Sequence, residues 1–204
     1  MRLITALLLA FLLPSTASAV VLGSSYAGSD TAFNFNLNVP KNHATVQWII
    51  ATPFTCASAC TPDTAYFRLK KAAGSPTDGL NVLIYDQSAS LPNAVVCTGA
   101  NIDPAPLTTS FSTTSSAIAS CNLAAGTYWL TLNRSLTTTD NANYVGPAGT
   151  NTSVNACGKG NPAGSWAVGC SDHGTSNIYF QLDGTLGGGA AAAEPFRNFV
   201  AFWW

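Results

Sequence analysis

The sequence predicts an all-β protein, an antiparallel jelly-roll-like β-sandwich with local disulfides. Three observations lead to this fold class. Short segments of alternating apolar and polar residues recur along the chain, turn residues separate them, and no stretch of residues 20–186 keeps an apolar period of 3.6 residues. About eight or nine short strands at such spacing are typical of a sandwich or a barrel.

The first 19 residues have the features of a secretory signal peptide. Arg2 supplies a positive charge, residues 3–13 are apolar, and Ala17-Ser18-Ala19 is a small-x-small cleavage site. A membrane-spanning helix needs about 20 apolar residues, so this stretch is too short for an anchor. We therefore expect export to the extracellular space or the cell surface, cleavage after Ala19 and no transmembrane span in the mature chain.

The first predicted strands differ in how their apolar residues are spaced. Residues 33–39 alternate four apolar residues with asparagine, and residues 46–51 form a short run that ends before Pro53. Residues 66–71 place Phe67 and Leu69 on one face, which we expect to be buried.

The later strands continue the series. Residues 80–85 are nearly all apolar, as in a strand covered on both sides, and residues 127–133 alternate Tyr128, Leu130 and Leu132 with polar neighbours or tryptophan. Residues 178–182 form the last strand. Weaker candidates are residues 95–98, 111–113 and 118–123, and turns are expected at Gly74-Ser75-Pro76, Asp78-Gly79, Leu91-Pro92-Asn93, Ala125-Gly126 and Asp183-Gly184.

Two regions depart from the strand pattern. Residues 137–172 read as a long loop rich in Asn, Gly, Pro and Thr, and loops of this length usually carry a function or are tied down covalently. Residues 187–193 form a Gly/Ala linker to an aromatic C-terminal tail, residues 194–204. The tail fits an interfacial segment, a segment docked on the domain, a processing signal or a truncated reading frame equally well.

All six cysteines follow the predicted signal peptide, and an even number in an exported protein indicates disulfides. Six cysteines allow 15 pairings. We favour the pairing of nearest neighbours, because each pair closes a local loop rich in turn residues: Cys56–Cys60, Cys97–Cys121 and Cys157–Cys170. The Cys56-x-x-x-Cys60 spacing also occurs in zinc sites, but no second ligand pair accompanies it, so we predict no metal and no cofactor.

Three segments carry a family resemblance. They are residues 66–85, with Lys-Lys and Gly-Ser-Pro between two strands, residues 125–132, and residues 177–185. The pattern resembles bacterial secreted β-sandwich domains of the choice-of-anchor or PEP-CTERM-associated type, over residues 45–186. The resemblance implies a jelly roll that is exported, displayed or anchored at the cell surface. It implies no catalytic residues.

The chain is poor in charge, which limits the partners that it can bind. Only 8% of its residues are charged and its formal net charge is -1, whereas an ordinary soluble domain is about 25% charged. Such a chain lacks the basic surface that nucleic acids and anionic membranes require. The composition favours neutral partners, either glycans or other copies of the same chain.

A set of outward-facing aromatic and amide residues forms the candidate binding site. If Phe67, Leu130 and Phe180 face the core, their neighbours on each strand face away from it. Exposed aromatic rings stack on sugar rings, and amides supply hydrogen bonds. The candidates are Tyr66, Trp129, Asn133, Trp166, Tyr179 and Gln181. The alternative is that these aromatic side chains support a second sheet or a long loop.

Self-assembly is a second hypothesis. Residues 33–39 have the alternation of a strand that completes a neighbouring copy's sheet, and the aromatic tail, residues 194–204, offers another route to self-association. An ordinary intramolecular edge strand explains residues 33–39 equally simply.

An extracellular hydrolase is the third hypothesis. Asp172-His173 is the only adjacent acid–imidazole pair, and no G-x-S-x-G motif is present. Most aspartates lie beside Gly, Pro or Asn, where they favour turns. We therefore predict no catalytic residue and a non-enzymatic function.

Overall fold

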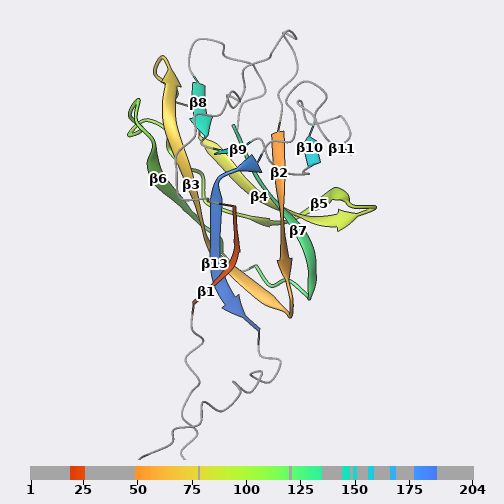
Figure 1. Cartoon of the computed structure of the whole chain (residues 1–204). Coiled ribbons are helices and arrows are strands. Elements are labelled where there is room, and N and C mark those ends of the chain that lie inside the picture. Colours follow the sequence, from red (N-terminus) through yellow and green to blue (C-terminus); the bar gives the residue numbers. More distant parts are fainter. Residues whose placement is uncertain are drawn as a thin grey trace, which may run out of the picture.

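The computed structural model describes residues 19–25, 49–77, 79–119, 121–134, 144–147, 149–150, 156–158, 166–168 and 177–187. Within these ranges the protein is built from antiparallel strands and contains no helix. Two sheets lie face to face (Figure 1). The prediction of an all-β, antiparallel, disulfide-bonded fold is therefore confirmed.

The first sheet has five strands among the described residues. Four of them follow in the order β1-β13-β3-β6, and β8 pairs with the far end of β3. Their bounds are Val20–Ser24 for β1, Phe180–Leu186 for β13, Cys60–Ala73 for β3, Ser112–Ala117 for β6 and Tyr144–Pro147 for β8. The sequence did not predict β1, and β3 begins six residues before its predicted start. The turn predicted at Asp183-Gly184 is wrong, because β13 continues through both residues.

The second sheet has the order β11-β10-β2-β7-β4-β5. The bounds are Ala167–Val168 for β11, Ala156–Gly158 for β10, Ile49–Cys56 for β2, Gly126–Arg134 for β7, Leu80–Ser88 for β4 and Leu91–Thr98 for β5. A separate pair joins β12 (Asn177–Ile178) to β9 (Gly149–Thr150). The prediction of one long loop over residues 137–172 is thus wrong in part, because β8 to β11 lie within it.

Two predicted strand ends are also wrong, for local reasons. Strand β2 continues through Pro53. Its described pairing with β10 covers only Ile49–Ala51, so Pro53 lies where that edge of β2 is open. An open edge tolerates proline, which has no N–H group to donate to a neighbouring strand. The turn predicted at residues 91–93 lies instead at Ala89 and Ser90, which both have positive φ angles, 48° and 64°. Two such residues form the tight turn that a two-residue hairpin requires.

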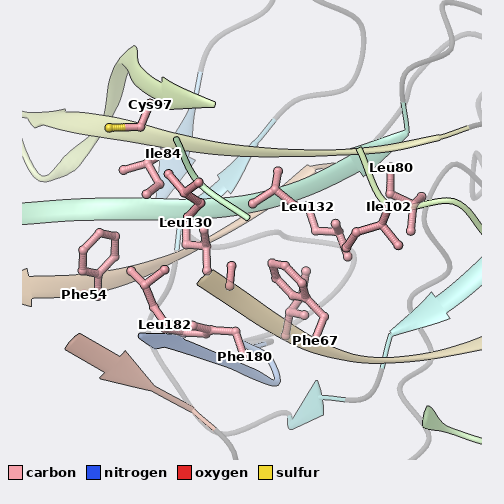
Figure 2. Close-up of a cluster of buried hydrophobic side chains, with 14 of the residues drawn as sticks. Phe54, Phe67, Leu80, Ile84, Cys97, Ile102, Leu130, Leu132, Phe180 and Leu182 are labelled. Atoms are coloured by element: carbon pink, nitrogen blue, oxygen red, sulfur yellow. The ribbon is translucent and has the colours of Figure 1, made fainter. Parts of the chain in front are cut away.

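The core lies between the two sheets. Figure 2 shows Phe54, Ile84, Leu130 and Leu132 of the second sheet meeting side chains of the first. The first sheet contributes Phe67, Leu69, Phe180 and Leu182, which are all buried. Alternation places these residues on the inner faces, as the sequence predicts for Phe67, Leu69, Leu130 and Phe180.

Two of the predicted disulfides are present. Cys56–Cys60 joins the end of β2 to the start of β3, and Cys97–Cys121 joins the end of β5 to the segment before β7. Their Cα atoms are 5.8 and 5.6 Å apart. The third predicted pair lies in part outside the described residues, because Cys157 is in β10 but Cys170 is not described.

Candidate ligand-binding site

The outer face of the first sheet carries a row of large polar side chains along β3. Tyr66, Arg68 and Lys70 alternate with the buried residues Phe67 and Leu69, so the three side chains lie on the face that points away from the core. Each of the three is half-buried. The row therefore combines an aromatic ring with two cations at a spacing of two residues.

The neighbouring strands place more polar groups beside this row. Tyr66 is opposite Gln181 on β13 and opposite Ser115 on β6, and Arg68 is opposite Thr113 on β6. Directly opposite residues of an antiparallel pair have Cβ atoms about 5 Å apart, so their side chains interact. Three strands thus contribute to one polar surface.

This surface contains a cavity with a volume of about 320 Å³. Tyr66, Arg68, Thr113, Tyr179 and Gln181 line it, together with Phe67 and Phe180. Its walls hold two phenol rings, a guanidinium, a hydroxyl and an amide. Aromatic walls with a few convergent polar groups are typical of small-ligand sites.

Hydrogen bonds hold the polar side chains of the cavity in place. The Arg68 guanidinium donates from Nη1 to Thr113 Oγ1 at 3.0 Å and from Nη2 to the carbonyl oxygen of Phe111 at 3.3 Å. Gln181 donates from Nε2 to Asp183 Oδ1 at 2.8 Å. Side chains that are already held lose less conformational entropy when a ligand binds.

The second cation of the row lies over an aromatic ring. The Lys70 ammonium is 4.7 Å from the centre of the Phe111 ring, within the range of a cation–π interaction. Since the carbonyl of Phe111 also accepts from Arg68, this one residue supports both cations.

The structure brings together three of the six predicted binding residues, Tyr66, Tyr179 and Gln181. Tyr66 has the predicted outward orientation. The expected exposure of Tyr179 is wrong: its side chain is only 2% exposed. The residue lies between β12 and β13 and forms a wall of the cavity, so its ring is enclosed.

The other three predicted residues belong to the opposite side of the molecule. Trp129 and Asn133 lie on the outer face of the second sheet, where Trp166 also packs. The expected exposure of Trp129 is wrong, because it is 6% exposed and packs in a cluster with Ala51, Tyr85, Leu91 and Trp166. Tyr85 and Trp166 meet edge to face with ring centres 5.3 Å apart. The alternative explanation, an outward aromatic residue beneath the long segment, is therefore correct for Trp129.

Two polar atoms on this second face are buried without a hydrogen-bond partner, Nε1 of Trp129 and Oδ1 of Asn133. Neither residue lines the cavity. The six predicted residues thus divide between two opposite faces and do not form one site.

Two polar residues of the cavity, Arg68 and Thr113, were not selected from the sequence as binding residues. Arg68 is two residues from Tyr66, so strand alternation alone places both on one face, and this spacing is the signal that could have identified it. Thr113 gives no such signal, because only the pairing of β3 with β6 brings it next to Arg68.

The described residues include no group of three His, Cys, Asp or Glu side chains arranged to hold a metal ion. In the same part of the chain, no helix has the length and apolar character needed to span a membrane. Residues 33–39 and 194–204, the predicted assembly segments, and His173 lie outside the described residues.

A comparison with models of known protein families gives no match, and a search of curated proteins likewise gives none.

Proposed function

We propose that this protein is a secreted, non-enzymatic surface or extracellular-matrix protein that binds carbohydrate in the cavity on the outer face of the first sheet. The observation that carries the proposal is the convergence of Tyr66, Tyr179 and Gln181 in one cavity with Arg68 and Thr113. A phenol ring stacks on the apolar face of a sugar, and the amide, hydroxyl and guanidinium groups bond its hydroxyls.

The size of the cavity is compatible with this ligand class. Small-molecule pockets measure about 300–1,000 Å³, so a cavity of about 320 Å³ fits a ligand of one or two sugar rings. A longer glycan would continue across the polar surface of β3, β13 and β6.

We further infer that the sandwich is a jelly roll. The β4–β5 hairpin is at the centre of the topology, and the strands before it pair with those after it in reverse order: β3 with β6, β2 with β7 and β1 with β13. Successive pairs enter alternate sheets. A long hairpin folded over itself in this way produces the two Greek keys of a jelly roll, as the resemblance to choice-of-anchor domains implies.

Export is supported by two independent features. The sequence begins with the features of a signal peptide, and four of the described cysteines form the two disulfides Cys56–Cys60 and Cys97–Cys121. Such bonds persist mainly in oxidising compartments outside the cytoplasm.

Two aromatic substitutions test the site. Tyr66→Ala should reduce glycan affinity at least about fivefold, because it removes a stacking ring worth about 1 kcal/mol or more, and should leave the melting temperature nearly unchanged. Trp129→Ala should lower the melting temperature and leave the glycan affinity nearly unchanged. Trp129 lies on the opposite sheet and is 6% exposed, and truncation of a buried tryptophan costs about 3–5 kcal/mol of stability. Binding is measured on a glycan array and by polysaccharide pull-down, and stability by thermal denaturation.

Tyr66→Phe is the matched control, because it keeps the ring and should keep most of the affinity. Glycan binding that survives in a folded Tyr66→Ala protein would place the ligand elsewhere. A wild-type protein that binds no glycan at all would contradict the proposed function.

A further inference from the structure

We infer that the glycan bound in this cavity is acidic, and that Arg68 and Lys70 recognise its carboxylate or sulfate groups. The inference rests on the proposed function, because it names the class of sugar that the same site accepts. It differs from the expectation of a neutral partner, which came from the average composition of the chain.

One of the few cations of this protein, Arg68, lines the cavity, and Lys70 lies on the same face of β3. The sequence contains only eight Lys and Arg residues, and three of them, Arg68, Lys70 and Lys71, lie within four positions of β3. A net charge of -1 describes the whole molecule. It does not describe the potential that a ligand meets above β3.

The cations lie in line with the aromatic platform. Tyr66, Arg68 and Lys70 share one face of β3, and alternate residues of a strand are about 6.6 Å apart. A sugar ring stacked on Tyr66 would therefore place its substituents within reach of Arg68. A second acidic group along the glycan would meet Lys70.

The guanidinium is held in a position suited to this role. Its bonds to Thr113 Oγ1 and to the carbonyl of Phe111 fix its orientation at the wall of the cavity. Arginine binds carboxylate and sulfate-like groups through a planar fork of N–H donors, and a fork already held in place loses little entropy on binding.

Among the described residues that line the cavity, Arg68 is the charged side chain, and none is acidic. The carboxylate of Asp183 on β13 accepts a hydrogen bond from Gln181. Asp183 is opposite Thr64, whereas Gln181 is opposite Tyr66, so the carboxylate lies two residues farther along β13 on the same face. An acidic sugar at Tyr66 therefore meets Arg68 on one side, and an amide separates it from Asp183 on the other.

Binding to matched pairs of polysaccharides tests the inference. Polygalacturonate is compared with its neutral methyl ester, and sulfated carrageenan with neutral agarose, by affinity electrophoresis and calorimetry. We expect at least one acidic member to bind about tenfold tighter than its neutral counterpart, with a preference that shrinks as salt is raised. The two pairs distinguish a carboxylate from a sulfate.

Variants that remove one charge test whether Arg68 causes the preference for acidic polysaccharides. Arg68→Gln should abolish this preference, and Lys70→Gln should weaken it. Lys71→Gln is the matched control, because it removes the same charge from the same strand at a position that alternation places on the other face. The affinity of this variant for the acidic polysaccharide should stay within about twofold of that of the parent protein.

The outcomes separate the two proposals. Equal affinity for acidic and neutral members, with binding still lost in Tyr66→Ala, would overturn the acidic preference and leave carbohydrate binding in place. An acidic preference that persists in folded Arg68→Gln, or tighter binding of a single-stranded oligonucleotide than of any glycan, would also overturn the inference. Absence of binding to all of the polysaccharides tested would contradict the proposed function itself.

Discussion

At the scale of single residues, Thr52 carries a cost that a simple substitution can remove. Its hydroxyl oxygen is buried and has no hydrogen-bond partner, and the residue is 5% exposed. An unsatisfied buried polar group costs about 1–3 kcal/mol. Thr52→Val keeps the branched shape, so we expect the free energy of unfolding to rise by about 1 kcal/mol, measured by urea denaturation.

Thr131 provides the matched comparison for this prediction. It is equally buried, at 1% exposure, but its hydroxyl donates to the carbonyl of Leu83 at 3.3 Å. Thr131→Val should therefore lower the stability by about 0.5–1 kcal/mol. The same sign of change in both variants would contradict the explanation.

Tyr85 makes the stability of the protein depend on alkaline pH. Burial against Trp129 and Trp166 desolvates its phenol and raises the pKa of Tyr85 above the ordinary value of 10.0. The unfolded chain therefore loses this proton first, so the free energy of unfolding falls as the pH rises above 10. Tyr85→Phe should show a shallower fall between about pH 9 and 11, measured by denaturant titration at each pH. Identical slopes for both proteins would be inconsistent with a desolvated phenol.

Tyr66 and Trp129 show what alternation predicts about a residue and what it does not. The pattern correctly places both side chains on outer faces of the sandwich. It does not tell which outer face is covered, because the cover over Trp129 includes Trp166, which is 37 positions away in the sequence. The exposure of an outward residue is a property of long-range packing.

At the scale of elements, the two disulfides close loops of very different length. The cysteines of Cys56–Cys60 are 4 positions apart, and those of Cys97–Cys121 are 24 positions apart. In the chain-entropy account, removal of a crosslink costs more when its loop is longer, about 3.5 kcal/mol for the long loop and about 2 kcal/mol for the short one. We expect the Cys97→Ala/Cys121→Ala variant to melt at the lower temperature in calorimetry.

The short-loop variant, Cys56→Ala/Cys60→Ala, is the control for this comparison. Both pairs are buried, so each variant loses two sulfur atoms from the core and the difference between them reports the loop. A lower melting temperature for the short-loop variant would contradict the entropic account.

The strands themselves were partly predictable from local pattern. Six or more residues of strict alternation, as in residues 127–133, identify β7 nearly to its ends. Strand β1, Val20–Ser24, has no alternation to detect. It becomes a strand because its backbone pairs with β13, more than 150 positions away.

At the scale of the whole molecule, sheet order follows from pairings that no local pattern contains. The cavity depends on three strands that meet only after folding, since β3 pairs with both β6 and β13. The sequence could therefore identify Tyr66, Tyr179 and Gln181 as candidates but could not separate them from Trp129, Asn133 and Trp166. The average charge likewise does not describe the local distribution, because Arg68, Lys70 and Lys71 lie within four positions of β3.

The pairing of β1 with β13 also sets the response of the domain to force. The strands are antiparallel, with Val20 opposite Gly184 and Ser24 opposite Gln181, so Ala19 and Gly187 emerge at the same end. Tension between these two residues would break the backbone hydrogen bonds between β1 and β13 one after another, starting at that end, instead of loading all of them at once. The last contacts to give way would be those of the Ser25 hydroxyl with the backbone of Ile178 and Phe180. Because none of the described residues that line the cavity belongs to β1, the domain would yield at this strand before the surface around the cavity was disturbed.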